Sequence, residues 1–588
     1  MDSKHVTEST SGQKDIQKTW WKEAIIYQIY PRSFQDSDGD GIGDLNGITS
    51  RLDYIQSLGV DIIWLNPIFL SPNDDNGYDI SDYREIMREF GTMEDFDRLL
   101  KEIHKREMRL VLDLVVNHTS DEHPWFEEAR KSRHNPYYNY YHWWPAEKGE
   151  PPLRLSYFDE EGNAWMYNKS TDSYYLHYFS RKQPDLNWEN PEVRQEIFDM
   201  MRFWFDKGID GFRMDSISLI AKDPSFPLID SKKYPDIFSF YAKEPRLHLY
   251  LHEMNRQVLS IYDCMSVGEG SAVMVDDVAK FVDPAREELN MLYHFDAARI
   301  RNTTLPDNPE SGIDYSLIAL KKMFTEWDKA VDKGWPSIYL GNHDQPRMVS
   351  RFGSDKDEFR ALSAKMLITF LLTMRGTPYW FAGDEIGMRN IRFDRIEDYN
   401  DIDTINRYKK AKAEGKDPQA VLDEQKETGR DNARTPFQWD RSPEAGFTAG
   451  TPWLKVNPDY TWINVADEEK DPTSILNYFK KVVSFRKENP SLIYGSYHLL
   501  DAENPQCYIF LRKTGADTYL IMLNFSPKAA ISTPGIDMSN AHVLLDNYGD
   551  RSHMAPQKDI TLRPFEAIVF QLNHPVYESF IDSLDLLE

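Results

Sequence analysis

Cysteine is scarce in this sequence, with only Cys264 and Cys507 among 588 residues. Two cysteines so far apart exclude a disulfide framework and favour a reducing compartment, so we expect a cytoplasmic protein. Long apolar runs are also missing. No run approaches the roughly 18 residues that a membrane span needs. Residues 1–18 are polar and lack the apolar core of a secretory signal, so we predict a disordered N-terminal arm.

Positive charge is in deficit, because 69 basic residues face 96 acidic ones and the net charge is −27. An acidic surface argues against nucleic acid or an anionic membrane as the main partner, and its ordinary meaning is solubility. Aromatic residues are plentiful at 13%, with 15 Trp and 32 Tyr. That content fits a packed globular protein, and it also fits sugar binding, because the CH faces of pyranose rings stack on aromatic rings.

Eight short apolar runs without strict alternation are typical of buried parallel strands. They span residues 25–30, 60–66, 110–117, 209–215, 265–269, 292–296, 337–344 and 378–384. Helical patterns lie between them. Thr92 and Asp95 begin one in the manner of a capping box, while Asn190, Pro191 and Gly208 mark both ends of another. Eight alternations predict the α/β class and a (β/α)₈ TIM barrel.

Two stretches interrupt the barrel pattern. Residues 118–188 are too long for a simple crossover and are crowded with aromatics, so we predict an inserted subdomain with the run 137–144 in its core. Short alternating strands near the C-terminus predict an antiparallel β-sandwich domain. The predicted organisation is an arm at 1–18, barrel at 19–117 and 189–495 with a helical and loop insertion at about 390–453, the subdomain at 118–188, the β-sandwich at 496–574 and a tail at 575–588.

Polar side chains stand at four of the predicted strand ends. They are Asp113, Asn117 and His118 on the third strand, Arg213 and Asp215 on the fourth, Glu269 on the fifth, and Asn342, His343 and Asp344 on the seventh. Active sites of such barrels lie at the C-terminal ends of the strands. One acidic residue there is ordinary, but four such ends on one face of the barrel are hard to explain by packing.

Cleavage of a glycosidic bond accounts for this set of residues. The reaction builds oxocarbenium character, so one carboxylate must attack or shield the anomeric carbon while a second carboxyl group protonates the leaving oxygen. A retaining enzyme holds the two roughly 5 Å apart, and neighbouring strands lie about 4.8 Å apart. Asp215 and Glu269, on adjacent strand ends, can meet that separation. We expect Arg213 to keep Asp215 ionised and Glu269 to keep its proton near neutral pH.

Six motifs carry a resemblance to a known family. They are DLVVNH at 113–118, QPDLNW at 183–188, GFRMD at 211–215, Gly268-Glu269, NHD at 342–344 and RDNARTPFQW at 430–439. In this order and strand context, the chain resembles the α-amylase family of glycoside hydrolases, in its oligo-1,6-glucosidase, maltase and sucrose isomerase branch. The match runs from about residue 20 to residue 572. It implies the same barrel and a covalent glucosyl intermediate.

The resemblance also implies roles for the matching residues. Asp215 matches the nucleophile, Glu269 the acid/base and Asp344 a third carboxylate that grips glucose hydroxyls. Three further positions match groups that bind glucose hydroxyls or the nucleophile, namely His118, Arg213 and His343. Asp113 resembles a residue that orders the loops behind the site.

A closed glucose pocket is implied by the same resemblance. Asp75 and Tyr78 match the carboxylate and the stacking aromatic that hold the terminal glucose, although Tyr78 also suits a plain core position. Arg434 matches an arginine that pairs with Asp75 and closes the pocket. Phe179 and Gln183 match its lining. A pocket closed in this way makes such enzymes exo-acting on short substrates.

A metal loop is predicted directly after the first strand, whereas catalysis in this family needs no cofactor. Oxygen donors alternate there as in a calcium loop, and the predicted ligands are Asp36, Asp38, Asp40, Ile42 and Asp44. Gly47 stands where an EF-hand would have its final Glu, so the loop is not an EF-hand. The resemblance implies a structural Ca²⁺ remote from catalysis, and an Asp-rich surface turn is the alternative.

Substrate choice stays open because the chain departs from the family pattern. Ser216 follows Asp215, where the branch has Val in α-1,6-preferring enzymes and Thr in α-1,4-preferring or sucrose-acting ones. Arg299 matches the first arginine of the Arg-Leu-Asp-Arg run of sucrose isomerases, although the rest of the run does not match. The neighbouring stretch ELNM at 288–291 also resembles these isomerases. Our first hypothesis is a retaining exo-α-glucosidase acting on isomaltose-like or maltose-like oligosaccharides or disaccharides. The alternatives are a sucrose isomerase and a non-catalytic, transporter-associated barrel, which would carry a membrane helix and lack the catalytic set.

Overall fold

The computed structural model describes residues 18–158, 162–234, 236–515, 517–536, 538–552 and 558–572. Nearly all of the predicted arm and the whole of the predicted tail at 575–588 lie outside these ranges. Within them, no helix combines the length and the apolar character that crossing a membrane requires.

Eight parallel strands form the central sheet, in the order β11-β10-β9-β5-β2-β1-β13-β12. Their bounds are β1 (Ile26–Ile29), β2 (Ile62–Leu65), β5 (Arg109–Val115), β9 (Gly211–Asp215), β10 (Met265–Glu269), β11 (Met291–Tyr293), β12 (Ser337–Ile338) and β13 (Thr377–Phe381). Each lies within, or overlaps with, one of the eight predicted runs. The predicted fold class, an α/β barrel, is therefore confirmed.

Side chains join the two end strands of this sheet, β11 and β12. Ser337 Oγ donates to the carbonyl of Leu292 (2.9 Å), and Tyr339 Oη donates to the carbonyl of His294 (2.7 Å). The sheet is thus a nearly closed barrel. The seventh strand ends at Ile338 and not at residue 344 as predicted. The residues after it form the turns that carry His343 and Asp344 over the mouth.

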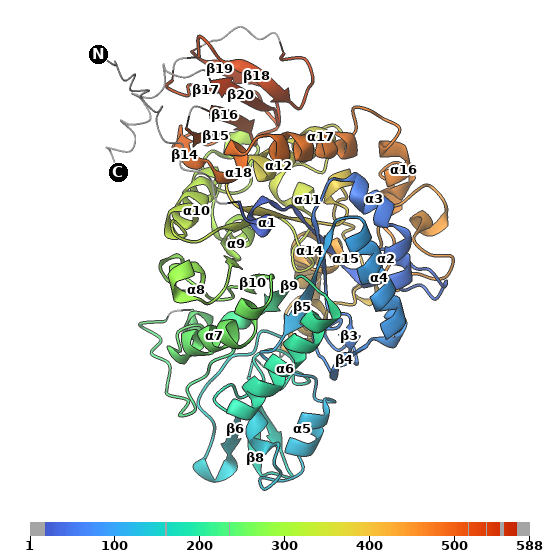
Figure 1. The fold of residues 1–588 in the computed structure, drawn as a ribbon, viewed down its shortest axis with the longest axis vertical. Coiled ribbons are helices and arrows are strands. Elements are labelled where there is room, and N and C mark those ends of the chain that lie inside the picture. The colour runs from blue at the N-terminus through green and yellow to red at the C-terminus, as the bar shows by residue number, and fades with distance from the viewer. Residues whose placement is uncertain are drawn as a thin grey trace, which may run out of the picture.

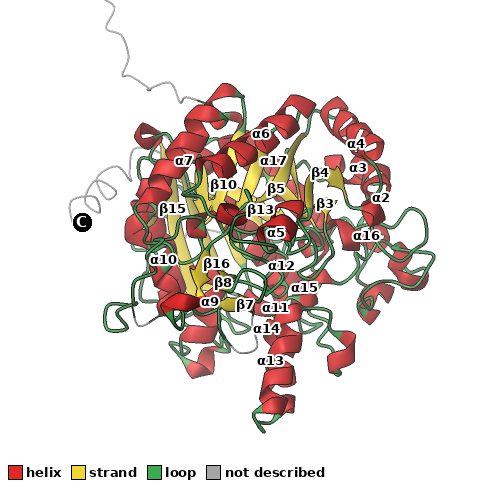
Figure 2. Cartoon of the chain, turned by 90° about the horizontal axis from the view of Figure 1, so that it is seen from below, coloured by secondary structure: helices red, strands yellow, loops and turns green. Residues whose placement is uncertain are grey.

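Helices surround the strands, as Figures 1 and 2 show. Both predicted pairs of helix signals are present. Thr92 and Asp95 make a reciprocal capping box at α4 (Met93–Lys105). Asn190 caps α6 (Pro191–Lys207), which ends at Gly208 with φ 108°. The other long helices are α7 (Arg246–Gln257), α9 (Asp296–Thr303), α10 (Leu317–Ala330), α12 (Arg360–Thr373) and α17 (Ile475–Glu488).

The segment between β5 and β9 contains a small antiparallel sheet of order β6-β8-β7. Its strands are β6 (Trp143–Pro145), β7 (Trp165–Asn168) and β8 (Ser173–Leu176), and α5 (Pro124–Ala129) precedes them. The Trp143 ring stacks on Phe126 (5.9 Å) and on Tyr138 (4.9 Å). The aromatic run therefore packs as a core, as predicted. In Figure 1 this sheet lies at the far end of the molecule from the C-terminal strands.

The C-terminal strands form an antiparallel sheet of order β14-β15-β16-β20-β18 and a two-stranded ribbon of β17 and β19. Their bounds are β14 (Ser496–Leu500), β15 (Cys507–Thr514), β16 (Asp517–Asn524), β17 (Ala530–Ser532), β18 (His542–Asp546), β19 (Ile560–Leu562) and β20 (Ala567–Leu572). One face packs on the barrel through Phe370 of α12, which contacts Tyr508 and Phe510. The ribbon packs against the other face. The domain boundaries given above remain a prediction.

An insertion after β13 returns the chain to the barrel mouth. Helices α13 (Ile402–Ala413) and α14 (Pro418–Thr428) pack together and project from the body at the lower edge of Figure 2. The short helix α15 (Asp431–Arg434) follows. It brings two arginines, Arg430 and Arg434, close to the C-terminal strand ends.

Candidate active site

Three carboxylates from neighbouring strands meet at the buried guanidinium of Arg213 on β9. Its Nη1 donates to Asp113 Oδ1 (2.7 Å) and to Asp215 Oδ1 (2.8 Å), while its Nη2 contacts Glu269 Oε2. Strand β9 pairs with β5 on one side and β10 on the other, which places these residues side by side. The predicted nucleophile and acid/base therefore share one guanidinium.

Burial and like charge outweigh the single arginine in this cluster. Burial raises the pKa of Asp215 well above its usual value, the Glu269 carboxylate adds to the effect, and Arg213 opposes both. Burial likewise raises the pKa of Asp113 to about 6 against the pull of Arg213. We expected Arg213 to keep Asp215 ionised. It acts in that direction, but burial and the neighbouring carboxylates outweigh it.

Tyr78 and His343 form a stacked layer beneath these carboxylates. Their rings lie 5.2 Å apart and nearly parallel, at 6°. The Tyr78 hydroxyl donates to Asp113 Oδ2 (2.9 Å) and accepts from Asn66 Nδ2 (2.6 Å). Gln28 Nε2 lies 2.8 Å from His343 Nδ1, which assigns the ring proton to Nε2, facing Tyr78 Oη at 2.7 Å. Burial lowers the pKa of His343 to about 3, so the ring is neutral at pH 7.

Asp344 remains ionised because two arginines hold it. Its Oδ1 accepts from Arg434 Nη2 (3.0 Å) and from Arg430 Nη1 (3.2 Å). Burial opposes ionisation, but His343, Arg430 and Arg434 together hold the pKa of Asp344 well below its usual range. Since His343 is neutral at pH 7, the arginines carry this effect. The Asp344 side chain is 23% exposed and so can be reached by a substrate.

Asp75 has a different partner from the one predicted. Its Oδ1 pairs with Arg430 Nη2 at 3.2 Å, whereas Arg434 binds Asp344 and donates from Nε to the carbonyl of His343 (2.9 Å). The two arginines are one helical turn apart. Arg430 immediately precedes α15, and it is this first arginine that faces Asp75. Arg430 also pairs with Asp401 (2.5 Å). The predicted pairing of Asp75 with Arg434 is therefore corrected to a pairing with Arg430, which sequence reasoning missed.

The other predicted pocket residues surround Asp75. Gln183 Nε2 donates to Asp75 Oδ2 (3.3 Å) and to the carbonyl of Tyr78 (3.2 Å). His118 Nε2 donates to the same carbonyl (3.0 Å), and its ring lies against Phe179 (5.1 Å). Burial raises the pKa of Asp75 to about 6 although Arg430 and Arg434 oppose it. This wall is polar, largely buried and aromatic on one side.

Ser216 lies directly after Asp215 and is buried, with a φ of 43°. That left-handed conformation is costly for a non-glycine residue and is typical of functional turns at strand ends. Two hydroxyls that sequence reasoning missed contact Glu269, namely those of Tyr293 and Ser271. The signal that could have found Tyr293 is a polar aromatic residue inside the strand that follows the Glu269 strand.

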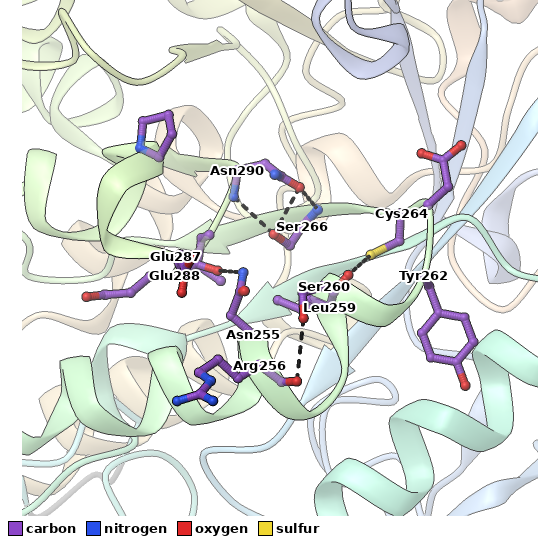
Figure 3. A pocket seen from close by; sticks show the side chains of 13 residues that line it. Asn255, Arg256, Leu259, Ser260, Tyr262, Cys264, Ser266, Glu287, Glu288 and Asn290 are labelled. Carbon is purple, nitrogen blue, oxygen red and sulfur yellow. Dashed lines mark hydrogen bonds between the residues drawn. The ribbon is translucent and has the colours of Figure 1, made fainter.

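The isomerase-like stretch before β11 does not reach this site. Glu288 is buried and pairs with His248 (2.8 Å) and Arg286 (2.7 Å). It lines a cavity of about 570 Å³, shown in Figure 3, where Ser266 and Asn290 lie at the N-terminal ends of β10 and β11. Glu269 stands at the opposite end of β10. The cavity is thus separate from the carboxylate cluster.

Three of the five predicted metal ligands converge. Carboxylate oxygens of Asp36, Asp38 and Asp40 all lie within 4.8 Å of one another. Asp44 lies outside this cluster, and its carboxylate caps α2 (Leu45–Ser50) by accepting from the Gly47 amide (2.7 Å). The amide of Ile42 donates to Asp40 Oδ1 (2.8 Å). Hydrogen bonds from backbone amides to the loop's own aspartates therefore stabilise its conformation, and the loop is also rich in oxygen atoms that can bind a metal.

Known proteins match both the sequence and the fold. Residues 28–495 match the alpha amylase catalytic domain family. The chain is 51% identical to the oligo-1,6-glucosidase of Parageobacillus thermoglucosidasius, over 95% of this chain and 100% of that one. The trehalulose synthase MutB from Pseudomonas mesoacidophila MX-45 superposes with a TM-score of 0.89 and 42% identity, over 94% and 99% of the chains. The isomaltulose synthase SmuA from Protaminobacter rubrum superposes with a TM-score of 0.89 and 43% identity, over 95% of this chain and 100% of that one. The chain belongs to the α-amylase family of glycoside hydrolases, in the branch of the oligo-1,6-glucosidases and sucrose isomerases.

Proposed function

We propose that this enzyme is a retaining, exo-acting α-glucosidase that releases glucose from the non-reducing end of short α-glucosides, with isomaltose and isomalto-oligosaccharides as its preferred class. The observation that carries the proposal is the single guanidinium of Arg213, which contacts both Asp215 and Glu269. Two carboxyl groups held on one planar fork lie close enough for the roughly 5 Å separation of a retaining pair. Identity to oligo-1,6-glucosidases supports the substrate class.

The proposed reaction has two displacement steps. Glu269 gives its proton to the glycosidic oxygen while an Asp215 oxygen bonds to the anomeric carbon, and the bond to the leaving sugar breaks. Glu269, now ionised, then takes a proton from water as that water bonds to the same carbon and releases Asp215. Asp344, kept ionised by its two arginines, is the proposed acceptor for glucose hydroxyls. No cofactor takes part.

The ion pair between Asp75 and Arg430 supports exo action. It joins the strand-two loop to the insertion after β13, with Asp401 and Phe158 packed against the same guanidinium. A buried and paired arginine at this place blocks the path of a longer sugar chain beyond the terminal glucose. The substrate then has to enter with its non-reducing end first.

Sucrose isomerisation is the second candidate, and the similarity to trehalulose and isomaltulose synthases favours it. It would use the same glucosyl–Asp215 intermediate, with released fructose in place of water as the acceptor. Of the isomerase signals in the sequence, Arg299 is exposed at α9 and the stretch around Glu288 faces away from the site. The placement of Glu288 away from the carboxylate cluster favours hydrolysis.

Product analysis separates the two candidates. Incubation with isomaltose, maltose and sucrose in parallel is expected to give glucose as the main product, with isomaltose turned over fastest. Products are resolved by anion-exchange chromatography and quantified over time. Isomaltulose or trehalulose as the main product from sucrose would establish the isomerase instead, and absence of turnover with every α-glucoside would remove the enzyme assignment altogether.

We also propose that the loop at 36–44 binds a structural Ca²⁺. The donor set fits, because three carboxylates converge and hard cations prefer oxygen ligands. The main-chain carbonyl of Ile42 and the carboxylate of Asp44 are the other two proposed ligands.

Removal of calcium is expected to lower the melting temperature by about 2 °C, the size that ligand-linked stabilisation of about 2 kcal/mol predicts for a chain of this length. The measurement is a thermal scan with excess Ca²⁺ and with chelator. The double variant Asp38→Asn/Asp40→Asn should show no difference between the two conditions, while its turnover at 25 °C stays normal. Equal melting temperatures for the unaltered enzyme in both conditions would refute the metal site.

We propose a cytoplasmic location from the state of the cysteines and the surface charge. Both cysteines are free thiols, with Cys507 buried and Cys264 half-buried. Together with the acidic surface, this supports work in a reducing cytoplasm on small soluble sugars, with neither nucleic acid nor membrane as partner.

A further inference from the structure

Two hydroxyl groups contact the carboxyl group of Glu269, one on each oxygen. Tyr293 Oη donates to Oε2 (3.1 Å), and Ser271 Oγ donates to Oε1 (2.8 Å). Oε2 is also in contact with Arg213 Nη2. Oε2 is therefore held from two sides by large buried groups, whereas Oε1 meets, among the residues that the structure describes, only the small hydroxyl of Ser271, which can rotate.

The position of Tyr293 is set by the barrel itself. Strands β10 and β11 pair in a register that puts Tyr293 directly opposite Glu269. Tyr293 is 3% exposed, and its ring packs on Tyr339 (5.4 Å) and Phe295 (5.9 Å). Its hydroxyl accepts from Arg213 Nε (2.8 Å). Burial raises the pKa of Tyr293 well above its usual value, so the phenol keeps its proton throughout the working pH range.

Arg213 cannot hold Glu269 without help, because its guanidinium also serves Asp113 and Asp215. Its Nη1 is shared by those two carboxylates, and only Nη2 remains for Glu269. A group that accepts a hydrogen bond from Nε and donates one to Oε2 would link Glu269 to that side of the guanidinium. The Tyr293 hydroxyl has this geometry.

On the proposed assignment of Glu269 as the acid/base, we propose that Tyr293 is a positioning residue that holds Oε2 against Arg213. Oε1 is then the oxygen that gives and takes the proton. The Ser271 hydroxyl does not compete with this transfer, since it can rotate and accept from a protonated Oε1. Tyr293 itself touches neither the sugar nor the reacting bond.

Two kinetic consequences follow. A donor on Oε2 favours the ionised carboxylate, so loss of that donor should move the alkaline limb of kcat/KM toward higher pH. Loss of the Tyr293 hydrogen bond should also slow proton transfer most for the substrates whose leaving group depends most on protonation. Isomaltose has a poorly leaving alkoxide, whereas 4-nitrophenyl α-glucoside releases a stable phenolate with little protonic help.

Tyr293→Phe tests the proposal because it removes only the hydroxyl. We expect kcat on isomaltose to fall about tenfold, the scale of a partly impaired general acid, with KM within about twofold. On 4-nitrophenyl α-glucoside the loss should be about twofold to threefold, and the alkaline limb should move up by about half a pH unit or more. Equal losses on both substrates with an unmoved alkaline limb would show that Tyr293 only supports the fold.

Tyr339→Phe is the matched control. Tyr339 is a buried neighbour whose hydroxyl donates to a main-chain carbonyl, that of His294, and among the described residues it forms no hydrogen bond to Glu269. It should lower thermal stability to a similar degree and leave the pH profile and the substrate ratio unchanged. A shifted alkaline limb in this variant would show that any lost tyrosine hydroxyl here perturbs the site, which would overturn the specific role of Tyr293.

Site-specific incorporation of 2,3-difluorotyrosine at position 293 provides a second test that keeps size and fold. The more acidic phenol donates more strongly, so the alkaline limb should move to lower pH, opposite to Tyr293→Phe. Movement in the same direction for both would refute the proposal. If the unaltered enzyme cleaves no α-glucoside, the proposed function fails; if it cleaves them and both substitutions leave the pH profile unmoved, only the role of Tyr293 fails.

Discussion

Asp215→Asn is expected to lower kcat on isomaltose by about 10⁴-fold or more, because an amide cannot form the glucosyl ester through which both steps pass. The substitution keeps the shape of the side chain and leaves an oxygen to accept from Arg213. It also removes one of the charges that crowd the buried cluster. We therefore expect a folded protein that still binds substrate, measured by steady-state kinetics together with a melting temperature no lower than that of the unaltered enzyme.

The control for this variant is Asp199→Asn, which changes the same residue type at an exposed position on α6. Within the described part of the chain, Asp199 pairs only with its helix neighbours Gln195 and Arg202. Its loss should leave kcat within about 20%, as expected of a surface ion pair. Turnover of Asp215→Asn within tenfold of normal would exclude Asp215 as the nucleophile.

Arg430→Ala is expected to lower kcat/KM for isomaltose by about 100-fold, chiefly through KM, because it leaves Asp75 without its ion-pair partner and opens the pocket behind the terminal glucose. Arg430→Lys should lose about tenfold, since a point charge cannot reproduce the fork that spans Asp75, Asp344 and Asp401. The opened pocket should also lessen the preference for disaccharides over longer substrates.

A double-mutant cycle shows which arginine acts with Asp75. The pair Asp75→Ala and Arg430→Ala should give a coupling energy in kcat/KM of at least about 1 kcal/mol, whereas Asp75→Ala and Arg434→Ala should be nearly additive. Arg407→Ala is a surface control, because its ion pair with Glu424 between α13 and α14 is exposed. Strong coupling of Asp75 to Arg434 with none to Arg430 would contradict the observed pairing.

The barrel could be predicted in detail because its signals are local. Buried runs of β-branched and aromatic residues mark the strands, and Thr92, Asn190 and Gly208 mark helix ends that appear where expected. The convergence of Asp215 and Glu269 also followed, since the C-terminal ends of parallel strands share one face. The short seventh strand did not follow, because the turn after Ile338 is stabilised by distant side-chain contacts.

Long-range partners could not be predicted with the same success. Arg430 and Arg434 are four residues apart, so both face the same side of one turn, and nothing local tells which reaches Asp75, 355 residues earlier. Tyr293 was missed for a related reason. A tyrosine within a buried strand is ordinarily interpreted as a core residue, and only the register of β10 and β11 shows that its hydroxyl contacts Glu269. Asp44 shows a related limit, since its spacing predicts a metal ligand but does not reveal that its carboxylate also caps a helix.

The most direct test of the central claim is to trap the covalent intermediate with 5-fluoro-α-D-glucosyl fluoride and to locate the adduct by peptide mass spectrometry. The fluorine slows hydrolysis of the ester, so a retaining enzyme accumulates a labelled carboxylate. We predict a single fluoroglucosyl adduct on Asp215, formed in proportion to lost activity. An adduct on Glu269 or Asp344, or inactivation without any labelled peptide, would contradict the assignment of Asp215 and Glu269 as nucleophile and acid/base.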